Sequence, residues 1–170
     1  MDMITLEQLL ESRDRRYARQ VEWIRRHEGT TLVCMTVVLP GPVKRDERTL
    51  RIAKAGTEAV RKTLEPLSEQ LYDLETGFEG YFSVDGSVLD VKRICCEIED
   101  THPLGRLMDL DVLEPAGKGV VPVSRSRIGF PPRRCLLCDL PARVCMRAKT
   151  HSREALLAKI DEMLDLFSNL

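Results

Sequence analysis

Two aspartates, Asp109 and Asp111, stand two residues apart in a segment that otherwise has the apolar pattern of a buried strand, residues 107–113. Alternate residues of a strand face the same side and rise about 3.3 Å each, so both carboxylates project from one face with Cα atoms about 6.5 Å apart. Such neighbours repel, and a bound cation removes the repulsion. The pair is therefore typical of nucleotidyl- or phosphoryl-transfer sites that bind Mg²⁺ (or Mn²⁺) with substrate phosphates, although Asp-x-Asp also arises by chance on exposed strand faces.

Further candidates flank this strand. Glu97 and Glu99 share one face of a strand predicted over residues 87–99, so either side chain could add a metal ligand or act as a base. The following turn carries His102, a second candidate base, and Arg106, a candidate phosphate ligand. The alternative for His102 is a purely structural role.

Four residues near the C-terminus are of the types that bind zinc: Cys135, Cys138, Cys145 and His151. Cys135-x2-Cys138 has zinc-knuckle spacing, and the other two residues could complete a tetrahedral Cys3His site. The zinc would be structural, because four protein ligands leave no open position for chemistry. The alternative is a set of reduced thiols. The remaining cysteines are expected in the core: Cys34, Cys95 and Cys96.

Two cations are candidates for phosphate binding. Lys44 follows a Pro-Gly-Pro turn at the start of a predicted helix, where helix N-termini and basic side chains favour anions. Arg13 falls within the apolar stripe of the first predicted helix, where a guanidinium needs an anionic partner. The stripe consists of Leu6, Leu9, Leu10, Tyr17, Val21 and Ile24. The alternatives are a solvated turn for Lys44 and an internal salt bridge for Arg13.

The order of the predicted elements indicates a single α+β domain over residues 1–170, with a mixed β-sheet, flanking helices and a zinc-knuckle-like segment at 131–151. A nucleotidyltransferase-like sheet would suit this order. Helices are expected over 6–26 with a Thr5–Gln8 capping box, over 46–64 with Asp46 as N-cap, and after Thr150 or Ser152. Strands are expected over 31–39, 70–74, 80–84, 87–99 and 107–113, with Asp85-Gly86 as a hairpin turn.

Composition argues against two classes of partner. The 170 residues carry 26 basic and 27 acidic side chains, and aromatic residues make up 5%, so neither the net charge nor the number of stacking rings favours nucleic acid or an anionic membrane. The longest strongly apolar run, residues 31–39, is far shorter than the roughly 20 residues that cross a bilayer. The N-terminus lacks a signal-peptide pattern. We expect a cytoplasmic protein that binds neither nucleic acid nor membrane.

Taken together, the motifs resemble those of the CitX family, the apo-citrate lyase phosphoribosyl-dephospho-CoA transferases or holo-citrate lyase synthases. The matching stretches keep their order from residue 12 to residue 151: Ser12-Arg13-Asp14, residues 36–44, Glu99 with His102-Pro103-Leu104-Gly105-Arg106-x2-Asp109-x-Asp111, residues 131–138, and Cys145-x-Arg147-x3-His151. Residues 70–90 show no family motif.

The resemblance implies an enzyme of nucleotidyltransferase type. It takes 2′-(5″-triphosphoribosyl)-3′-dephospho-CoA, joins phosphoribosyl-dephospho-CoA to a serine of the citrate lyase acyl carrier (gamma) subunit, and releases pyrophosphate. We hypothesise that Asp109 and Asp111 hold magnesium against the triphosphate. The serine proton would pass to Glu97, Glu99 or His102. The phosphate charge would be neutralised by Arg13, Lys44 and Arg106. The arginines of the cysteine segment would face the acidic carrier protein.

Two alternatives remain open from the sequence. One is a zinc-stabilised module that binds nucleic acid or protein through the cysteine segment and its arginines. The other is a close relative that acts on a different carrier protein or on another nucleotide-like donor; the malonate decarboxylase carrier, for example, has a similar synthase. Catalysed pyrophosphate release separates enzyme from binding module, and exchanging carrier proteins separates the two enzymes.

Overall fold

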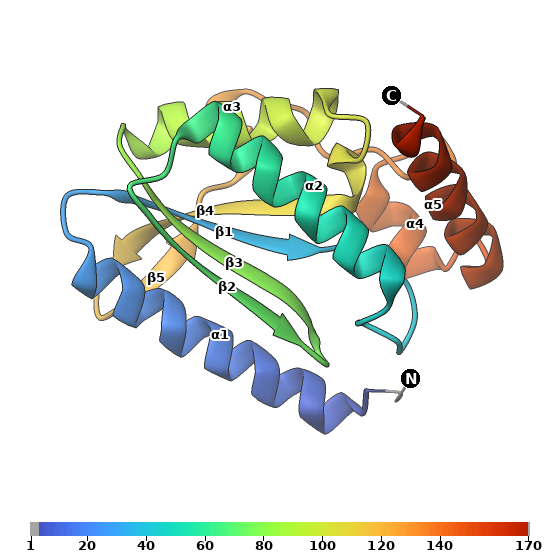
Figure 1. The fold of residues 1–170 in the computed structure, drawn as a ribbon, viewed down its shortest axis with the longest axis horizontal. Coiled ribbons are helices and arrows are strands. Elements are labelled where there is room, and N and C mark those ends of the chain that lie inside the picture. The colour runs from blue at the N-terminus through green and yellow to red at the C-terminus, as the bar shows by residue number, and fades with distance from the viewer. Residues whose placement is uncertain (1–3, 170) are drawn as a thin grey trace.

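A five-stranded sheet with the strand order β2-β3-β1-β4-β5 forms the centre of the computed structural model, which describes residues 4–169 (Figure 1). The strands are β1 (Thr31–Val37), β2 (Ser68–Leu74), β3 (Gly77–Val84), β4 (Met108–Ala116) and β5 (Gly119–Pro122). The helices are α1 (Leu6–Arg26), α2 (Glu47–Leu64), α3 (Val88–Thr101), α4 (Ala142–Ala148) and α5 (Arg153–Ser168), with short 3-10 turns η1 (Gly105–Leu107) and η2 (Arg125–Ile128). Helix α1 covers one face of the sheet, and α2 and α3 cover the other.

The α+β class is confirmed, but the sheet is antiparallel rather than mixed. All four strand pairings are antiparallel. Strands β3 and β4 run parallel to each other and are joined through α3, but β1 lies between them and pairs with both. No helix within residues 4–169 combines the length and apolar character needed to cross a membrane.

Several predicted helix ends are confirmed. Thr5 and Gln8 form the capping box of α1, and the Asp46 side chain accepts a hydrogen bond from the Thr49 amide at the start of α2. Ser152, rather than Thr150, is the N-cap of α5. Strand β5 and helix α4 were not predicted.

The predicted strand over residues 87–99 is wrong, because this segment is helix α3. The Ser87 hydroxyl accepts a hydrogen bond from the Asp90 amide as N-cap, so Asp85-Gly86 leads into a helix instead of forming a hairpin. Apolar residues at every second position, ending at Ile98, imitate a strand. Burial of Val91, Cys95 and Ile98 instead follows the helical period.

The two faces of the sheet differ in chemistry. The face under α2, α3 and α5 is the main apolar core, with Met35, Phe82 and Leu110 all fully buried. The α1 face has a smaller apolar cluster around Leu32 and a polar region beside it. Because α1 turns polar side chains toward this region, its buried residues are Ser12 and Gln20.

Half of the predicted apolar stripe of α1 is therefore exposed, whereas Val21 and Ile24 pack on the sheet as predicted. Leu6, Leu10 and Tyr17 are 72%, 49% and 49% exposed. Arg13, predicted on the core side, is also exposed and forms no ion pair within residues 4–169. The side chains that face inward one and two turns later are Arg16 and Arg19.

Glu79 of β3 is the reason that α1 presents arginines to the sheet. Its carboxylate is fully buried and accepts hydrogen bonds from Arg16 Nε (3.0 Å), Arg19 Nη1 (3.0 Å) and the Tyr81 hydroxyl (2.6 Å). The Arg19 guanidinium also lies over the Tyr72 ring, 4.5 Å from its centroid. A buried carboxylate requires such partners, so this ion-pair cluster fixes α1 to the sheet.

We predict that Glu79→Gln lowers the free energy of unfolding by about 2–3 kcal/mol, because it leaves two arginines without their counter-ion. The loss falls below that of a fully buried pair since Arg16 and Arg19 keep 27% and 30% of their side-chain surface exposed and can rehydrate. Urea unfolding at pH 7 measures it. Glu97→Gln, at an exposed site on α3, is the matched control with a change under about 0.5 kcal/mol. Equal losses in the two variants would contradict the assignment.

Candidate active site and metal centre

The strand register brings acidic side chains together on the α1 face. Asp109 of β4 lies opposite Thr36 of β1, which lies opposite Glu79 of β3. Asp111 occupies the next row, opposite Cys34. Because cross-strand partners share a face, Asp109 and Asp111 project side by side as predicted, on the same face as Glu79.

The two aspartates differ in environment. Burial, followed by the neighbouring charge of Asp109, raises the pKa of Asp111 to about 6, against the opposing effect of Lys92. The Asp109 side chain remains 43% exposed. One carboxylate that is costly to ionise beside one that opens to solvent fits a divalent cation, which favours the ionised form of both.

Side chains, not a neighbouring strand, cap the outer edge of β4 beside these aspartates. The Leu110 amide donates to Glu99 Oε1 (2.8 Å), and Lys92 Nζ donates to the Leu110 carbonyl (3.0 Å). The second oxygen of Glu99 accepts a hydrogen bond from Arg125 Nη1 (2.7 Å). Glu99 is almost fully buried, and both of its oxygens are engaged. Glu99 therefore provides the hydrogen-bond acceptor for the Leu110 amide, which no strand within residues 4–169 pairs with, next to the aspartates.

Arg133 holds the first part of β4 and one of the aspartates. Its Nη1 donates to Asp109 Oδ1 (3.2 Å), and its Nη2 donates to the carbonyls of Met108 (2.6 Å) and Arg106 (3.1 Å). Arg133 Nη1 also lies 4.0 Å from Glu99 Oε1. Since Arg133 precedes Cys135 by two residues, this side chain connects the cysteine segment to the aspartates.

The three predicted phosphate ligands lie around the same end of the sheet. Arg106 immediately precedes β4, and burial together with the charge of Arg133 lowers its pKa. Lys44 follows β1 and donates through Nζ to the Leu39 carbonyl (2.8 Å). Burial lowers the pKa of Lys44, and the nearby charge of Arg13 lowers it further. None of the three cations forms an ion pair among the described residues, which leaves them free for an anionic ligand.

Two predicted site residues lie away from the aspartates. Glu97 is exposed on α3, and because residues two apart on a helix point in nearly opposite directions, it does not share a face with Glu99 as predicted. His102 ends α3, and its Nδ1 accepts a hydrogen bond from the Leu104 amide (3.0 Å). Burial lowers the pKa of His102.

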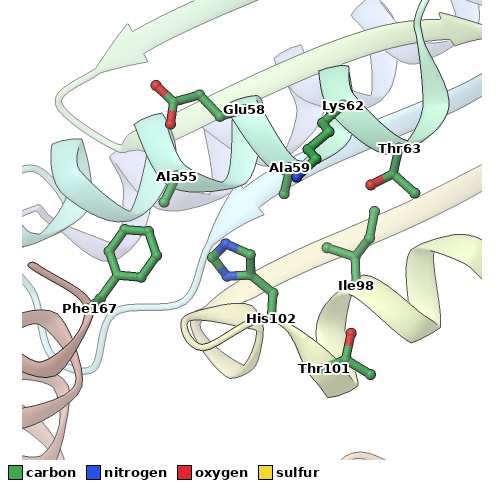
Figure 2. A pocket seen from close by; sticks show the side chains of 9 residues that line it. All are labelled: Ala55, Glu58, Ala59, Lys62, Thr63, Ile98, Thr101, His102 and Phe167. Carbon is green, nitrogen blue, oxygen red and sulfur yellow. The ribbon is translucent and has the colours of Figure 1, made fainter. Parts of the chain in front are cut away.

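The His102 ring lines a cavity of about 350 Å³ between α2, α3 and α5, beside Phe167 (Figure 2). The ring centroids of His102 and Phe167 are 5.5 Å apart. This cavity lies on the α2/α3 side of the sheet, opposite the face that carries Asp109. The structure therefore does not bring His102 to the aspartates.

The Cys/His cluster is assembled as predicted. One ligand atom from each of Cys135, Cys138, Cys145 and His151 lies within 4.8 Å of the others. Cys138 Sγ is 3.5 Å from Cys145 Sγ and 3.3 Å from His151 Nε2. Such an arrangement can bind a metal ion, and a Cys3His donor set is typical of structural zinc.

The environment of Cys135 favours the thiolate that a metal needs. Burial raises the pKa of its thiol, but hydrogen bonds from the Leu137 and Cys138 amides and from the neighbouring thiols outweigh burial and lower it to about 7. The cysteines predicted as core residues, Cys34, Cys95 and Cys96, are all buried.

Sequence reasoning missed the side chains that neutralise and position the acids. Arg16, Arg19 and Lys92 were not singled out, and Arg133 was noted only as part of a motif. Glu79 falls in the stretch without a family motif. The available signal for it was a lone acid within an otherwise apolar strand, which must find buried partners.

Comparison with known proteins identifies a family for this chain. The model of the CitX family, described as apo-citrate lyase phosphoribosyl-dephospho-CoA transferase, matches residues 4–167. Proteins with that name from Shigella boydii serotype 18 and Escherichia coli O157:H7 (strain EC4115) are each 41% identical over 167 residues, which is 95% of this chain and 89% of the relative. The chain belongs to the CitX family. Membership confirms the resemblance and the prediction of a transferase enzyme.

We predict that Asp111→Asn stabilises this CitX-family chain in metal-free buffer at pH 8 by about 1–3 kcal/mol, because it removes a carboxylate whose ionised form is penalised. A carboxyl pKa raised from 3.8 to about 6 makes this penalty complete above pH 6 and absent below about pH 4. The stabilisation by Asp111→Asn, measured as the free energy of unfolding in urea, should therefore decrease as the pH is lowered from about 6 to about 4. Asp14→Asn, at an exposed site on α1, serves as control. Destabilisation of Asp111→Asn at pH 8 would contradict the electrostatic account.

Proposed function

We propose that this chain transfers phosphoribosyl-dephospho-CoA from 2′-(5″-triphosphoribosyl)-3′-dephospho-CoA to a serine of the citrate lyase acyl carrier subunit, with release of pyrophosphate. The observation that carries the proposal is the Asp109/Asp111 pair on the α1 face, with unpaired cations at the same end of the sheet. The names of the relatives support the transferred group and the citrate lyase acceptor. We further propose that the enzyme works in the cytoplasm, where reducing conditions keep its thiols free for metal.

Asp109 and Asp111 are the proposed ligands of Mg²⁺ or Mn²⁺. When bound, the ion would neutralise negative charge on the triphosphate as it develops on the leaving pyrophosphate. Arg133 holds the Asp109 carboxylate in place from the edge of β4. Glu79 takes no part as a ligand, because Arg16, Arg19 and Tyr81 already occupy it.

Arg13, Lys44 and Arg106 are the proposed phosphate ligands. In the reaction, the serine oxygen forms a bond to the α-phosphorus while the bond from that phosphorus to the pyrophosphate oxygen breaks. Cations fixed beside the departing oxygens stabilise this charge more than they stabilise the bound donor.

None of the three residues predicted as the base is well placed for the serine proton. Both oxygens of Glu99 are engaged, Glu97 is exposed on α3, and His102 lies across the sheet. We therefore propose that the serine proton passes to solvent water and assign no base among these three residues.

The decisive experiment incubates the chain with the apo carrier subunit, the triphosphoribosyl-dephospho-CoA donor and magnesium, and follows the carrier by mass spectrometry. We expect a mass gain equal to phosphoribosyl-dephospho-CoA, with one pyrophosphate released per transfer. Asp109→Ala should lower the rate at least about 100-fold, because it removes a group that acts on the reacting phosphates. Glu97→Gln should leave the rate unchanged.

The control is a carrier whose acceptor serine is replaced by alanine, which should gain no mass. An unchanged rate in folded Asp109→Ala would remove the aspartates from the proposal. Transfer to another carrier protein but not to the citrate lyase subunit would favour the same chemistry on a different acceptor. If no carrier protein gave pyrophosphate release, the proposed transfer reaction would be contradicted.

We also propose that the Cys/His cluster binds one structural zinc. The purified chain should contain one zinc per molecule by elemental analysis, and Cys138→Ser should lose it and reduce the free energy of unfolding by several kcal/mol, because metal binding contributes folding energy directly. Cys95→Ala, at a buried core thiol, should keep its zinc. A zinc-free wild type with unchanged stability in the presence of chelator would contradict the zinc site.

A further inference from the structure

Exposed basic side chains are concentrated in the segment that holds the Cys/His cluster, here called the basic platform: Arg134, Arg143, Arg147, Lys149 and Arg153. Residues 134–153 hold these five basic side chains and one acidic one, Asp139, whereas the other 150 residues hold 21 basic and 26 acidic side chains. Within residues 4–169, no ion pair forms on Arg143, Arg147 or Lys149. The segment thus presents unpaired positive charge on a chain that is otherwise acidic.

The platform also exposes apolar side chains. Leu140, Val144 and Met146 are 49%, 48% and 75% exposed. Only Cys145 of α4 is buried, so this helix is held to the body by a cluster residue and leaves the rest of its surface to solvent. Apolar side chains within a polar, charged rim are typical of a protein-binding surface, and methionine adapts well to a partner.

The platform is continuous with the aspartates. The Arg133 carbonyl accepts a hydrogen bond from the amide of Ala142, the first residue of α4 (2.8 Å), while its guanidinium contacts Asp109. A single residue, Arg133, therefore connects the start of α4 to Asp109.

We propose that the basic platform is the docking surface for an acidic face of the carrier protein that bears the acceptor serine. This inference rests on the proposed function. Charge complementarity selects an acidic partner, and the exposed Leu140, Val144 and Met146 select a protein over a phosphate backbone. Residues 134–153 contain no Phe, Tyr or Trp, the rings on which single-stranded nucleic acid stacks.

The test is the double charge reversal Arg143→Glu/Arg147→Glu. It should raise the KM for the apo carrier about tenfold or more, because both cations that attract the partner become repulsive, while kcat and the KM for the donor stay within about twofold. Lys54→Glu/Lys118→Glu carries the same charge change at exposed sites on α2 and in the β4–β5 turn and should leave all three values within about twofold. Salt should raise the carrier KM of the wild type more steeply than that of the platform variant.

Zinc content and unfolding temperature are measured for every variant, because Arg143 lies close to Cys145. Met146→Asp tests the apolar part separately at a largely exposed side chain, and it should raise the carrier KM with its zinc retained. Direct binding of fluorescent apo carrier, measured by anisotropy without donor, should weaken in both platform variants and not in the lysine control.

The outcomes separate this proposal from the proposed function. Efficient transfer by the wild type with equal carrier KM in the platform and control variants overturns the docking surface alone. A wild type that transfers nothing overturns both proposals. Salt-dependent RNA binding that Arg143→Glu/Arg147→Glu abolishes, with the carrier KM unchanged, assigns the platform to nucleic acid instead.

Discussion

Three carboxylates on a single partly buried face of the sheet are the constraint on which the rest of the structure depends. Glu79, Asp109 and Asp111 project toward α1, and each buried charge needs compensation. Glu79 receives two arginines and a tyrosine hydroxyl, and Asp109 receives Arg133. Asp111 forms no ion pair within residues 4–169, and its pKa rises to about 6. The uncompensated charge thus lies where the proposed cation would bind.

This constraint explains the parts of the fold that depart from simple patterning. A helix over an apolar sheet face buries leucines, but α1 covers carboxylates and so buries Ser12 and Gln20 and directs Arg16 and Arg19 inward. Its apolar residues contact the sheet mainly further along, where Val21 and Ile24 pack on the cluster around Leu32. The amphipathic pattern therefore predicts the inward side of α1 correctly near its C-terminal end and incorrectly in its first turns.

The features that could be predicted reliably are those that depend on residues close together in the sequence. The Asp109/Asp111 geometry follows from the pleat of one strand, and the Cys/His cluster follows from ligand types within 17 residues. The caps of α1 and α2 were equally local. The prediction of a strand over residues 87–99 failed because apolar residues at alternate positions can suit a strand or a helix. The N-cap at Ser87 is the feature that indicates the helix.

Long-range partners could not be predicted from one sequence. Arg16 and Glu79 are separated by 63 residues, and Arg133 and Asp109 by 24. Their meeting depends on β1 lying between β3 and β4, which no local pattern specifies. The same holds for Glu99. Its place on a predicted strand preceding the aspartates suggested a third ligand, whereas its carboxylate accepts a hydrogen bond from the Leu110 amide at the free edge of β4.

The cysteine segment has few buried side chains, yet it contacts Asp109 of the proposed active site through Arg133. Within residues 131–151, Cys145 alone is buried, so apolar packing contributes little to holding this segment. The proposed zinc, held by the four convergent ligands, would supply what the core does not, since a metal can fix a segment that has few buried side chains. Arg133 lies at the start of that segment, and its guanidinium donates a hydrogen bond to Asp109. The position of the segment therefore affects the position of the Asp109 carboxylate. The ligand cluster therefore belongs to the architecture of the proposed active site, even though a four-ligand metal would take no direct part in chemistry.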